Sequence, residues 1–343
     1  DEVTQRFREG LNLQGADLRQ TKLGGLPLAR VNLSNTHLEK TNFNQAHLER
    51  ANFALSQLTG ANFTKAWLFD ASFRQAHLED ASFTEAQMES ANLYQAQCRN
   101  ASFYIAHLEG AYLGQANFAQ ATIRRAFVDA ATSWNDAIVW DEQHVTASLA
   151  DVRWNGANLA TIDWSQVRMI GDEREAHQRT DRDGKPKTRQ KWLDNYRRAV
   201  RANRQLAVAL RSQGMNEEAD MFAYRAQACQ RKLARRQGRW GAYLGSAFLD
   251  FLAGYGYRPL RTLFVYLVVL IGYAGAFYSQ SNGAISPLAA MIFSITSFHG
   301  RGFFPGGLAL DDGITVVAAT EAIVGLVIEV SFIATFTQRF FAR

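Results

Sequence analysis

Residues 61–90 read ANFTK AWLFD ASFRQ AHLED ASFTE AQMES, in units of five that each begin with alanine and carry an apolar residue at the third position. The same apolar position recurs every five residues from Leu13 to Val128, which makes 24 repeats in phase. The residue two places before it is usually small. A five-residue period fits neither the 3.6-residue turn of a helix nor the two-residue alternation of a strand. Each unit should therefore form one side of a wound coil.

This pattern, A-[NDS]-[LF]-x-x, resembles that of pentapeptide-repeat proteins, as in Ala61–Lys65 (ANFTK) and Ala91–Gln95 (ANLYQ). The resemblance implies a right-handed quadrilateral β-helix with four repeats per coil, here over residues 1–165. Six such coils, spaced ~4.8 Å apart like neighbouring strands, would make a rod roughly 29 Å long.

Phenylalanines support a coil of four repeats independently of the resemblance. One set recurs at every fourth repeat and should stack, and a second set lies two repeats away, on the opposite side of the coil: Phe43, Phe63, Phe83 and Phe103, then Phe53 and Phe73. The phase slips by one residue near Ala130–Thr132 and then resumes. Residues 134–164 should therefore form a looser final coil or two, capped by tryptophan.

Four histidines directly precede a central leucine of a repeat and should point outward: His37, His47, His77 and His107. His37 and His77 share a side but lie two coils, ~10 Å, apart, which is too far for one metal ion. We expect solvated surface here, with no metal site and no cofactor.

The chain becomes basic after the repeats. Residues 1–165 hold 13 Lys/Arg against 18 Asp/Glu, whereas residues 166–261 hold 21 against 10. Because the basic block ends at the first long apolar run, anionic lipid is a better partner for it than nucleic acid. By the positive-inside tendency, both termini should be cytoplasmic.

Three segments are expected between the repeats and the apolar runs. Residues 166–187 should be a charged linker. Residues 188–237 should form a cytoplasmic helical hairpin that turns at Gly214. Residues 238–257 should form a short amphipathic helix and a loop, and the helix resembles those that lie along the inner leaflet.

Two runs near the C-terminus, Leu260–Tyr278 and Ile314–Thr337, are long enough to cross a ~30 Å hydrocarbon layer as helices. Between them, Ser286-Pro287 supplies an N-cap and a proline at the first helical position, so a helix of roughly ten residues should begin there. Non-helical backbone at membrane depth is tolerated only where protein or water covers it. This order predicts a two-span pore domain over residues 258–343, with a re-entrant pore loop at 286–305.

The arrangement resembles the two-transmembrane pore module of the potassium-channel superfamily, although the family's T-x-G-Y-G filter is not present. One alignment places Gly300 and Gly302 on the family's two glycines. His299 is then an insertion, and Arg301 replaces the tyrosine. An alignment without a gap from Thr296 places His299 and Arg301 on the glycines themselves, so neither alignment implies potassium selectivity. The resemblance implies a pore loop or filter made of Thr296, Ser297, Phe298, His299, Gly300, Arg301, Gly302 and Phe303.

The second apolar run resembles the inner helix of that family, and Glu321, Gly325 and Glu329 recur along it at i, i+4 and i+8. Carboxylates inside a membrane are costly and normally face an aqueous path or a partner. For Glu321 a hydrogen bond to the short helix, near Ser294 or Thr296, is as good an interpretation as pore lining. A ring of Glu329 carboxylates would attract cations. Gly325 stands where the family commonly has a hinge glycine.

Phe332 and Phe336 continue this stripe, as gate candidates that would close the pore by dewetting or as packed core. One chain offers one pore loop, so several chains must surround a pore. We expect a homotetrameric channel for monovalent cations in the cell inner (plasma) membrane, with the β-helix available to a cytoplasmic protein partner. The competing interpretation is a membrane-anchored interaction scaffold without conduction. The sequence carries no phosphate loop, nucleophile elbow or zinc spacing, which argues against an enzyme.

Overall fold

The structure is a computed structural model that describes residues 10–143, 145–181, 184–257, 259–281, 284–300 and 313–340, with side chains of the last helix described as far as Ile333. It divides into two compact units, Asp1–Gln237 and Gly238–Arg343. The helical elements of the described residues are η1 (Trp164–Gln166), α2 (Gly171–His177), α3 (Arg189–Arg211), α4 (Asn216–Arg236), α5 (Trp240–Ala253), η2 (Gly254–Gly256), α6 (Pro259–Gln280), α7 (Pro287–Phe298) and α8 (Gly313–Phe340).

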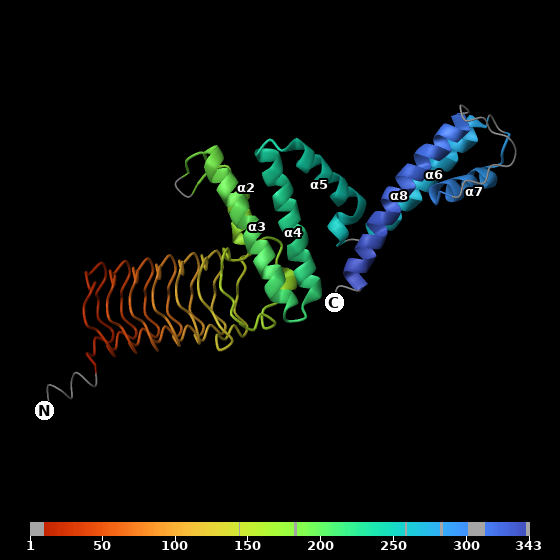
Figure 1. Cartoon of the computed structure of the whole chain (residues 1–343). Coiled ribbons are helices and arrows are strands. Elements are labelled where there is room, and N and C mark those ends of the chain that lie inside the picture. The colour runs from red at the N-terminus through yellow and green to blue at the C-terminus, as the bar shows by residue number, and fades with distance from the viewer. Residues whose placement is uncertain are drawn as a thin grey trace. The chain divides into compact units, whose positions relative to one another are not determined.

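The repeats wind into a β-helix in which each coil returns to the same side after four repeats (Figure 1). Parallel bridges join equivalent residues of successive coils, from Asn12 and Asn32 at one end to His107 and Phe127 at the other. The backbone N–H of each central residue donates to a carbonyl of the next coil, as Phe63 does to Ser82 at 2.7 Å. The prediction of four five-residue repeats per coil is confirmed.

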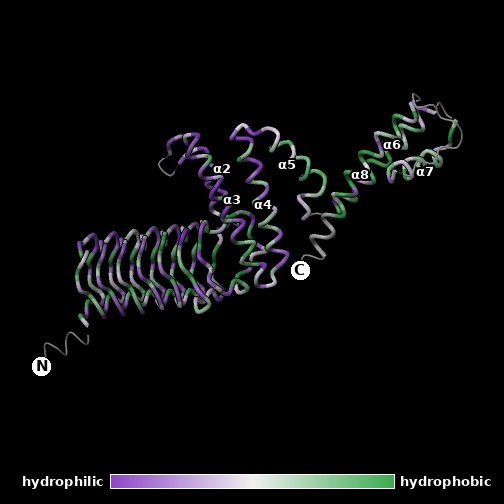
Figure 2. The backbone as a smooth tube through the Cα atoms, viewed as in Figure 1, coloured by the Kyte–Doolittle hydropathy of each residue, from purple (hydrophilic) through white to green (hydrophobic). Residues whose placement is uncertain are grey.

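The phenylalanine columns form as predicted. Phe43 stacks on Phe63 and Phe63 on Phe83, with ring centroids 4.8 and 4.9 Å apart, while Phe53 stacks on Phe73 at 4.9 Å. The two columns meet edge to face, as in the pair Phe63 and Phe73 at 5.6 Å. These rings are fully buried. Hydrophobic and hydrophilic residues are interspersed along every coil, as Figure 2 shows.

The corners of the coil require an unusual backbone. Residues at the fifth repeat position have positive φ, for example Lys65 at 58° and Gln75 at 57°. This region costs a residue with a side chain roughly 1–2 kcal/mol, and glycine takes the position only now and then, as at Gly60 and Gly110. The corners are strained throughout the rod, so coil-to-coil contacts must offset that strain.

The one-residue slip is confirmed, because Tyr112 bridges to Ser133, one position beyond the partner that the repeat register predicts. A second, larger insertion follows, since Thr122 bridges to Ser148, several positions beyond the same register. Past the slip, Trp134 still lies near Trp154, with ring centroids 6.5 Å apart.

The histidines of the repeats point outward, as predicted, with side chains 29 to 55% exposed. Each lies beside the glutamate two residues later, as in His47 and Glu49 at 3.4 Å. One grouping was not anticipated: among the described residues, ligand atoms of Glu89, His107 and Glu109 lie within 4.8 Å of one another, and all three side chains are partly exposed.

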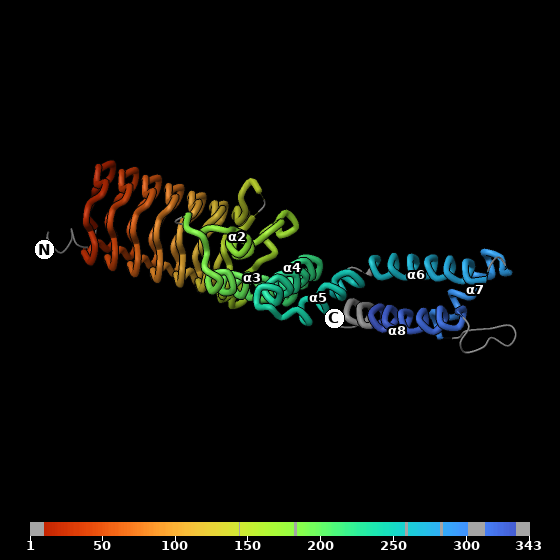
Figure 3. The backbone as a smooth tube through the Cα atoms, turned by 90° about the horizontal axis from the view of Figure 1, so that it is seen from above, coloured from red at the N-terminus to blue at the C-terminus, as the bar shows by residue number. Residues whose placement is uncertain are grey.

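The core of the β-helix continues into α3 and α4, which lie against its last coils (Figures 1 and 3). Leu206, Leu210 and Phe222 belong to the same buried cluster as the repeats. Trp164 meets Phe222 edge to face, with ring centroids 5.9 Å apart. The helical hairpin therefore caps the apolar cross-section of the last coil.

The cap also serves the polar backbone of the last coil. The side-chain oxygen of Gln213 accepts from the Leu159 N–H at 2.8 Å, and its amide donates to the Ala157 carbonyl at 2.7 Å. The Gln205 oxygen accepts from the Asp151 N–H at 2.9 Å. Two glutamines of the hairpin thus replace partners that a further coil would have supplied.

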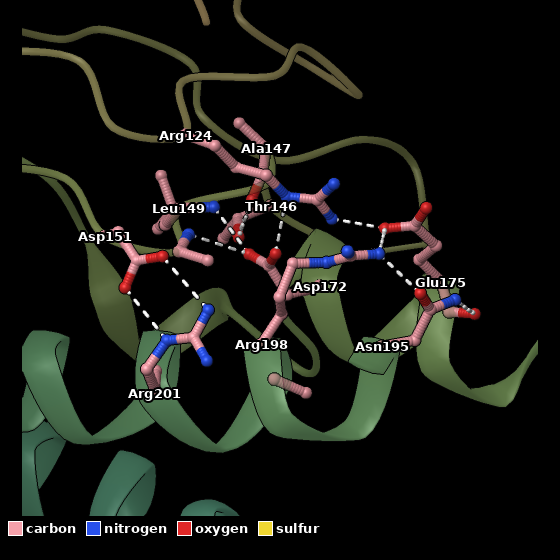
Figure 4. Close-up of polar contacts among 12 residues, drawn as sticks. Arg124, Thr146, Ala147, Leu149, Asp151, Asp172, Glu175, Asn195, Arg198 and Arg201 are labelled. Carbon is pink, nitrogen blue, oxygen red and sulfur yellow. Dashed lines mark hydrogen bonds and ion pairs between the residues drawn. The ribbon is translucent and has the colours of Figure 1, made fainter. Parts of the chain in front are cut away.

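The structure corrects the charged linker expected over residues 166–187. Part of that segment is α2, and its Asp172 is 1% exposed. One Asp172 oxygen accepts from the backbone N–H groups of Leu149 and Ala150 at 2.6 and 3.0 Å, and the other accepts from Arg124 at 2.7 Å (Figure 4). The carboxylate can be buried because all of these donors satisfy it.

The second unit is helical. Its α5 exposes Trp240, Leu244 and Phe248, whereas Leu252 near its end is buried with residues of α6, α7 and α8. Within the described residues, Leu260–Gln280 and Gly313–Ile333 are long and apolar enough to cross a membrane, with mean hydropathies of 1.8 and 2.1. Only 22% of the most apolar stretch of each helix is buried, so both leave most of their apolar surface uncovered.

Phe73→Ala should destabilise the fragment 1–237 by about 3–5 kcal/mol, because it removes a fully buried ring that stacks on Phe53 and meets Phe63 and Phe83 of the other column edge to face. Lys65→Ala, at an exposed corner, is the control and should change stability by less than about 0.5 kcal/mol. Urea unfolding followed by circular dichroism measures both, and equal midpoints would refute the repeat register.

Asp172→Asn should destabilise the same fragment by about 3 kcal/mol, because it removes the buried charge that two backbone N–H groups and Arg124 surround. Asp194→Asn, at an exposed position of α3 paired with Arg197, should cost less than about 1 kcal/mol. If both variants unfold at the wild-type urea concentration, α2 does not hold the hairpin to the coil.

Candidate functional site

The short helix α7 has the start that Ser286-Pro287 predicts. The Ser286 hydroxyl accepts from the Ala289 N–H at 3.2 Å, and Pro287 lies in the first helical turn. The helix runs for 12 residues to Phe298, and His299 is the residue that caps it. Gly300 follows with a φ of 66°, and its N–H donates to the Ser297 carbonyl at 2.9 Å.

The end of α7 lies directly against α8 at Gly325. A Cβ placed on Gly325 would lie 2.1 Å from the Phe298 carbonyl oxygen, far inside contact distance. The Phe298 side chain is buried beside Leu270 and Ile328 and meets Tyr266 edge to face at 4.8 Å. Glycine is therefore needed at position 325 for close helix packing, which is a different requirement from that of a hinge.

Glu321 is the most enclosed carboxylate of this unit, with 0% exposure. Its Oε1 is hydrogen-bonded to the Ser294 hydroxyl, which also lies 2.9 Å from the Leu270 carbonyl of α6. Its Oε2 is buried and, among the described residues, has no hydrogen-bond partner. The structure thus places Glu321 against α7, one of the two positions that the sequence left open.

Glu329 lies two turns further along α8 and is partly open to its surroundings, with 38% of its side chain exposed. Its Oε1 is hydrogen-bonded to Nδ1 of His299, the residue that ends α7. Both side chains line a cavity of about 430 Å³ that lies between α6, α8 and the end of α7. The other lining residues are Thr262, Leu263, Tyr266, Ile328, Phe332 and Ile333.

The structure brings some of the expected site residues together. The Thr296 hydroxyl donates back to its own helix, Ser297 is buried, and His299 and Gly300 are exposed. The side chain of Phe332 lines the cavity and is 39% exposed. The other expected site residues lie outside the described set: Arg301, Gly302, Phe303 and the side chain of Phe336.

The sequence did not predict that His299 pairs with Glu329, or that Tyr266 packs on Phe298 and lines the same cavity. His299 directly follows a short helix that packs on two long ones, so a partner on either long helix was within reach. The position of the partner along α8, however, depends on how deeply α7 packs, and the contact with Gly325 sets that depth.

Residues 27–64 and 66–103 match the family model for pentapeptide repeats, in eight copies. The chain therefore contains pentapeptide repeats, and the helices α2 to α8 lie outside the matched residues. None of the curated proteins matches the chain at a significant level of similarity.

Among solved structures, the chain is similar to HetL, a pentapeptide repeat protein involved in heterocyst differentiation regulation from the cyanobacterium Nostoc, at 20% identity over 46% of this chain and 91% of HetL, with a TM-score of 0.21. A pentapeptide repeat protein of the Arabidopsis thaliana thylakoid lumen matches at 26% identity over 38% of this chain and 73% of its own, with a TM-score of 0.24. A pentapeptide repeat protein from the cyanobacterium Cyanothece matches at 22% identity over 40% of this chain and 99% of its own, with a TM-score of 0.17.

Gly325→Ala should lower the thermal stability of the detergent-solubilised protein, because the new methyl group collides with the Phe298 carbonyl and must push α7 away at a cost of about 1–3 kcal/mol. Gly275→Ala is the control, since a Cβ at position 275 meets nothing within 4 Å. Size-exclusion chromatography after heating measures both. Equal loss of folded protein from the two variants would contradict the close packing of α7 on α8.

Proposed function

We propose that several copies of this chain assemble in a membrane and form a cation-conducting pore from α6, α7 and α8. The observation that carries the proposal is α7, an apolar helix of 12 residues that packs against both long helices. At ~1.5 Å per residue it is about 18 Å long and cannot cross a ~30 Å hydrocarbon layer. In the proposed pore α7 therefore enters the membrane without crossing it.

Assembly of several chains follows from the backbone after α7. Helical hydrogen bonding ends at His299, so the polar backbone beyond it requires protein or water around it. Within the described part of a single chain, α6, α8 and the end of α5 lie near this point. Copies arranged around an axis would enclose the end of α7 and place water in the middle, which is how pores of the potassium-channel superfamily are built and what the sequence resemblance implies.

The carboxylates of α8 support conduction of cations. Glu321 is enclosed by its own chain and holds α7 through Ser294. Glu329 is partly exposed and lines a cavity, so it is the carboxylate placed to meet an ion. A ring of such carboxylates, one from each chain, attracts cations. Because the T-x-G-Y-G filter is not present, we expect little discrimination between sodium and potassium.

A membrane-anchored scaffold is the second candidate function, and one observation favours it. Trp67 and Phe69 of the β-helix are 39 and 38% exposed, and His47 packs on the Trp67 ring at 3.7 Å. Such an aromatic patch suits a protein partner. An anchor, however, requires neither a half-length helix nor a buried carboxylate, and this chain has both.

Glu329→Gln should reduce the preference for cations, because it removes the charge that faces the ion path. The measurement is the reversal potential of purified protein in planar bilayers under a potassium chloride gradient. The wild-type reversal should lie near the potassium potential, and that of Glu329→Gln should move towards zero.

Glu321→Gln is the matched control, since the same charge is removed where the chain encloses it. Its reversal potential should stay within a few millivolts of the wild type. A wild-type reversal near the chloride potential, or one unchanged in Glu329→Gln, contradicts the assignment. Protein that never conducts favours the scaffold.

A further inference from the structure

A cavity of about 600 Å³ opens where the β-helix meets α3, and we call it the junction groove. Its walls carry four arginines, two from the repeats and two from α3: Arg124, Arg125, Arg198 and Arg201. Hydroxyl groups complete the wall on the side of the repeats: Thr84, Ser102, Tyr104 and Thr122. The groove lies wholly within the first unit. It therefore presents many hydrogen-bond donors to one volume.

The carboxylates around the groove do not balance these arginines. Asp151 is the one acidic group among the described lining residues, and Arg201 binds it with two hydrogen bonds of 3.0 and 3.1 Å. Those bonds from Arg201 hold the pKa of Asp151 below its usual range, so Asp151 is charged at neutral pH. Its charge offsets that of Arg201. Asp172 has no exposed side-chain surface, and the backbone N–H groups of Leu149 and Ala150 occupy one of its oxygens. Arg124 binds the other Asp172 oxygen and also Glu175. Four arginines thus face three carboxylates, which leaves one positive charge in excess for a ligand.

Arg198 carries a donor that nothing in the described part of the chain satisfies. Its Nη2 donates to Asn195 and lies 3.6 Å from Glu175, but its Nε is buried without a hydrogen-bond partner (Figure 4). A buried donor without an acceptor costs about 1–3 kcal/mol, more for a charged group. The Arg198 side chain as a whole is 31% exposed and lines the groove, so a ligand there would meet its guanidinium beside the enclosed Nε.

Tyr104 offers a second donor on the opposite wall. Arg125 donates from Nη1 to the Tyr104 hydroxyl at 3.1 Å. A phenol that accepts one bond retains its own proton to donate. An oxygen-rich anion in the groove would thus meet donors from the coil and from α3 together.

We propose that the junction groove binds a small molecule carrying a phosphate or pyrophosphate group, which bridges Arg125 and Tyr104 of the β-helix to Arg198 of α3. Phosphate oxygens suit this set because guanidinium groups bind them through paired, charge-assisted hydrogen bonds. The volume lies within the ~300–1,000 Å³ typical of small-molecule sites. The bound molecule would tighten the contact between α3 and the coil.

The test is isothermal titration calorimetry of the full detergent-solubilised chain with inorganic pyrophosphate, at neutral pH and constant ionic strength. One molecule should bind per chain, and added sodium chloride should weaken binding because it screens the partly open groove. Absence of binding at millimolar pyrophosphate overturns the proposal. This readout does not depend on conduction, so it can fail or succeed separately from the pore.

Arg198→Gln should weaken pyrophosphate binding by about tenfold or more, because it removes the charged donor that the ligand pairs with. Arg197→Gln is the matched control on the same helix. Arg197 pairs with Asp194 at 2.9 Å and does not line the groove, so its affinity should stay within about twofold of the wild type. Equal weakening by both changes would show non-specific attraction to the basic helix and overturn the site.

Arg125→Gln keeps the test valid if Arg198→Gln fails to fold. Arg125 is exposed and donates to the Tyr104 hydroxyl on the same wall, so the fold should tolerate the change. It should also weaken binding by about tenfold, because the ligand loses a charge-assisted donor from the coil. Unchanged affinity would contradict the bridge between the coil and α3.

Discussion

The register of four repeats per coil is the constraint from which the rest of the first unit follows. Each coil buries its phenylalanines, leucines and alanines only against the coils before and after it. The positive-φ corners add strain in every coil, so a coil without a neighbour has strain but no compensating contact. The last coil therefore needs a cover of matching shape.

Phe222 and Gln213 of the hairpin provide that cover. Phe222 covers the core, and Gln213 bonds the backbone. The hairpin and the β-helix form one compact unit for this reason, and that unit ends at Gln237 rather than at residue 165.

The sequence predicted those features whose cause is local or periodic. Phe73 recurs in step with Phe53, so its burial follows from spacing alone, and Ser286-Pro287 marks a helix start wherever it occurs. The segment 166–187 was predicted to be a charged linker because a count of charges cannot show the distant backbone N–H groups, those of Leu149 and Ala150, that enclose Asp172. The contact of His299 with Glu329 escaped prediction for a similar reason, since it depends on how deeply one helix packs on another.

The second unit uses a small residue and a polar residue to place a short helix between two long ones. Gly325 lets the Phe298 carbonyl approach α8, and Ser294 reaches both the Leu270 carbonyl and Glu321. Apolar side chains of packed helices already favour certain registers, and two polar contacts add positions that are more sharply defined. A carbonyl seated on a glycine and a hydroxyl between two acceptors each have one good position, so together they fix the depth at which α7 ends.

The backbone joins the two units at Gln237 and Gly238, so a ligand in the junction groove can act on the second unit through the end of α4. The described contacts tie the end of α4 to the start of α3: the Arg236 guanidinium lies 4.2 Å from the centre of the Trp192 ring, and Arg189 donates to the Arg236 carbonyl at 3.5 Å. Arg236 is one residue before the end of the first unit. A ligand that draws α3 against the coil therefore also constrains the residue from which the second unit continues. Suppose that α4 takes different positions in two states of the second unit. The two states then bind the ligand with different affinities. Because linkage is reciprocal, the ratio of those affinities equals the factor by which the ligand shifts the equilibrium between the states. Lipids or ions that favour one of those states would then change the affinity of the groove without touching any of its arginines.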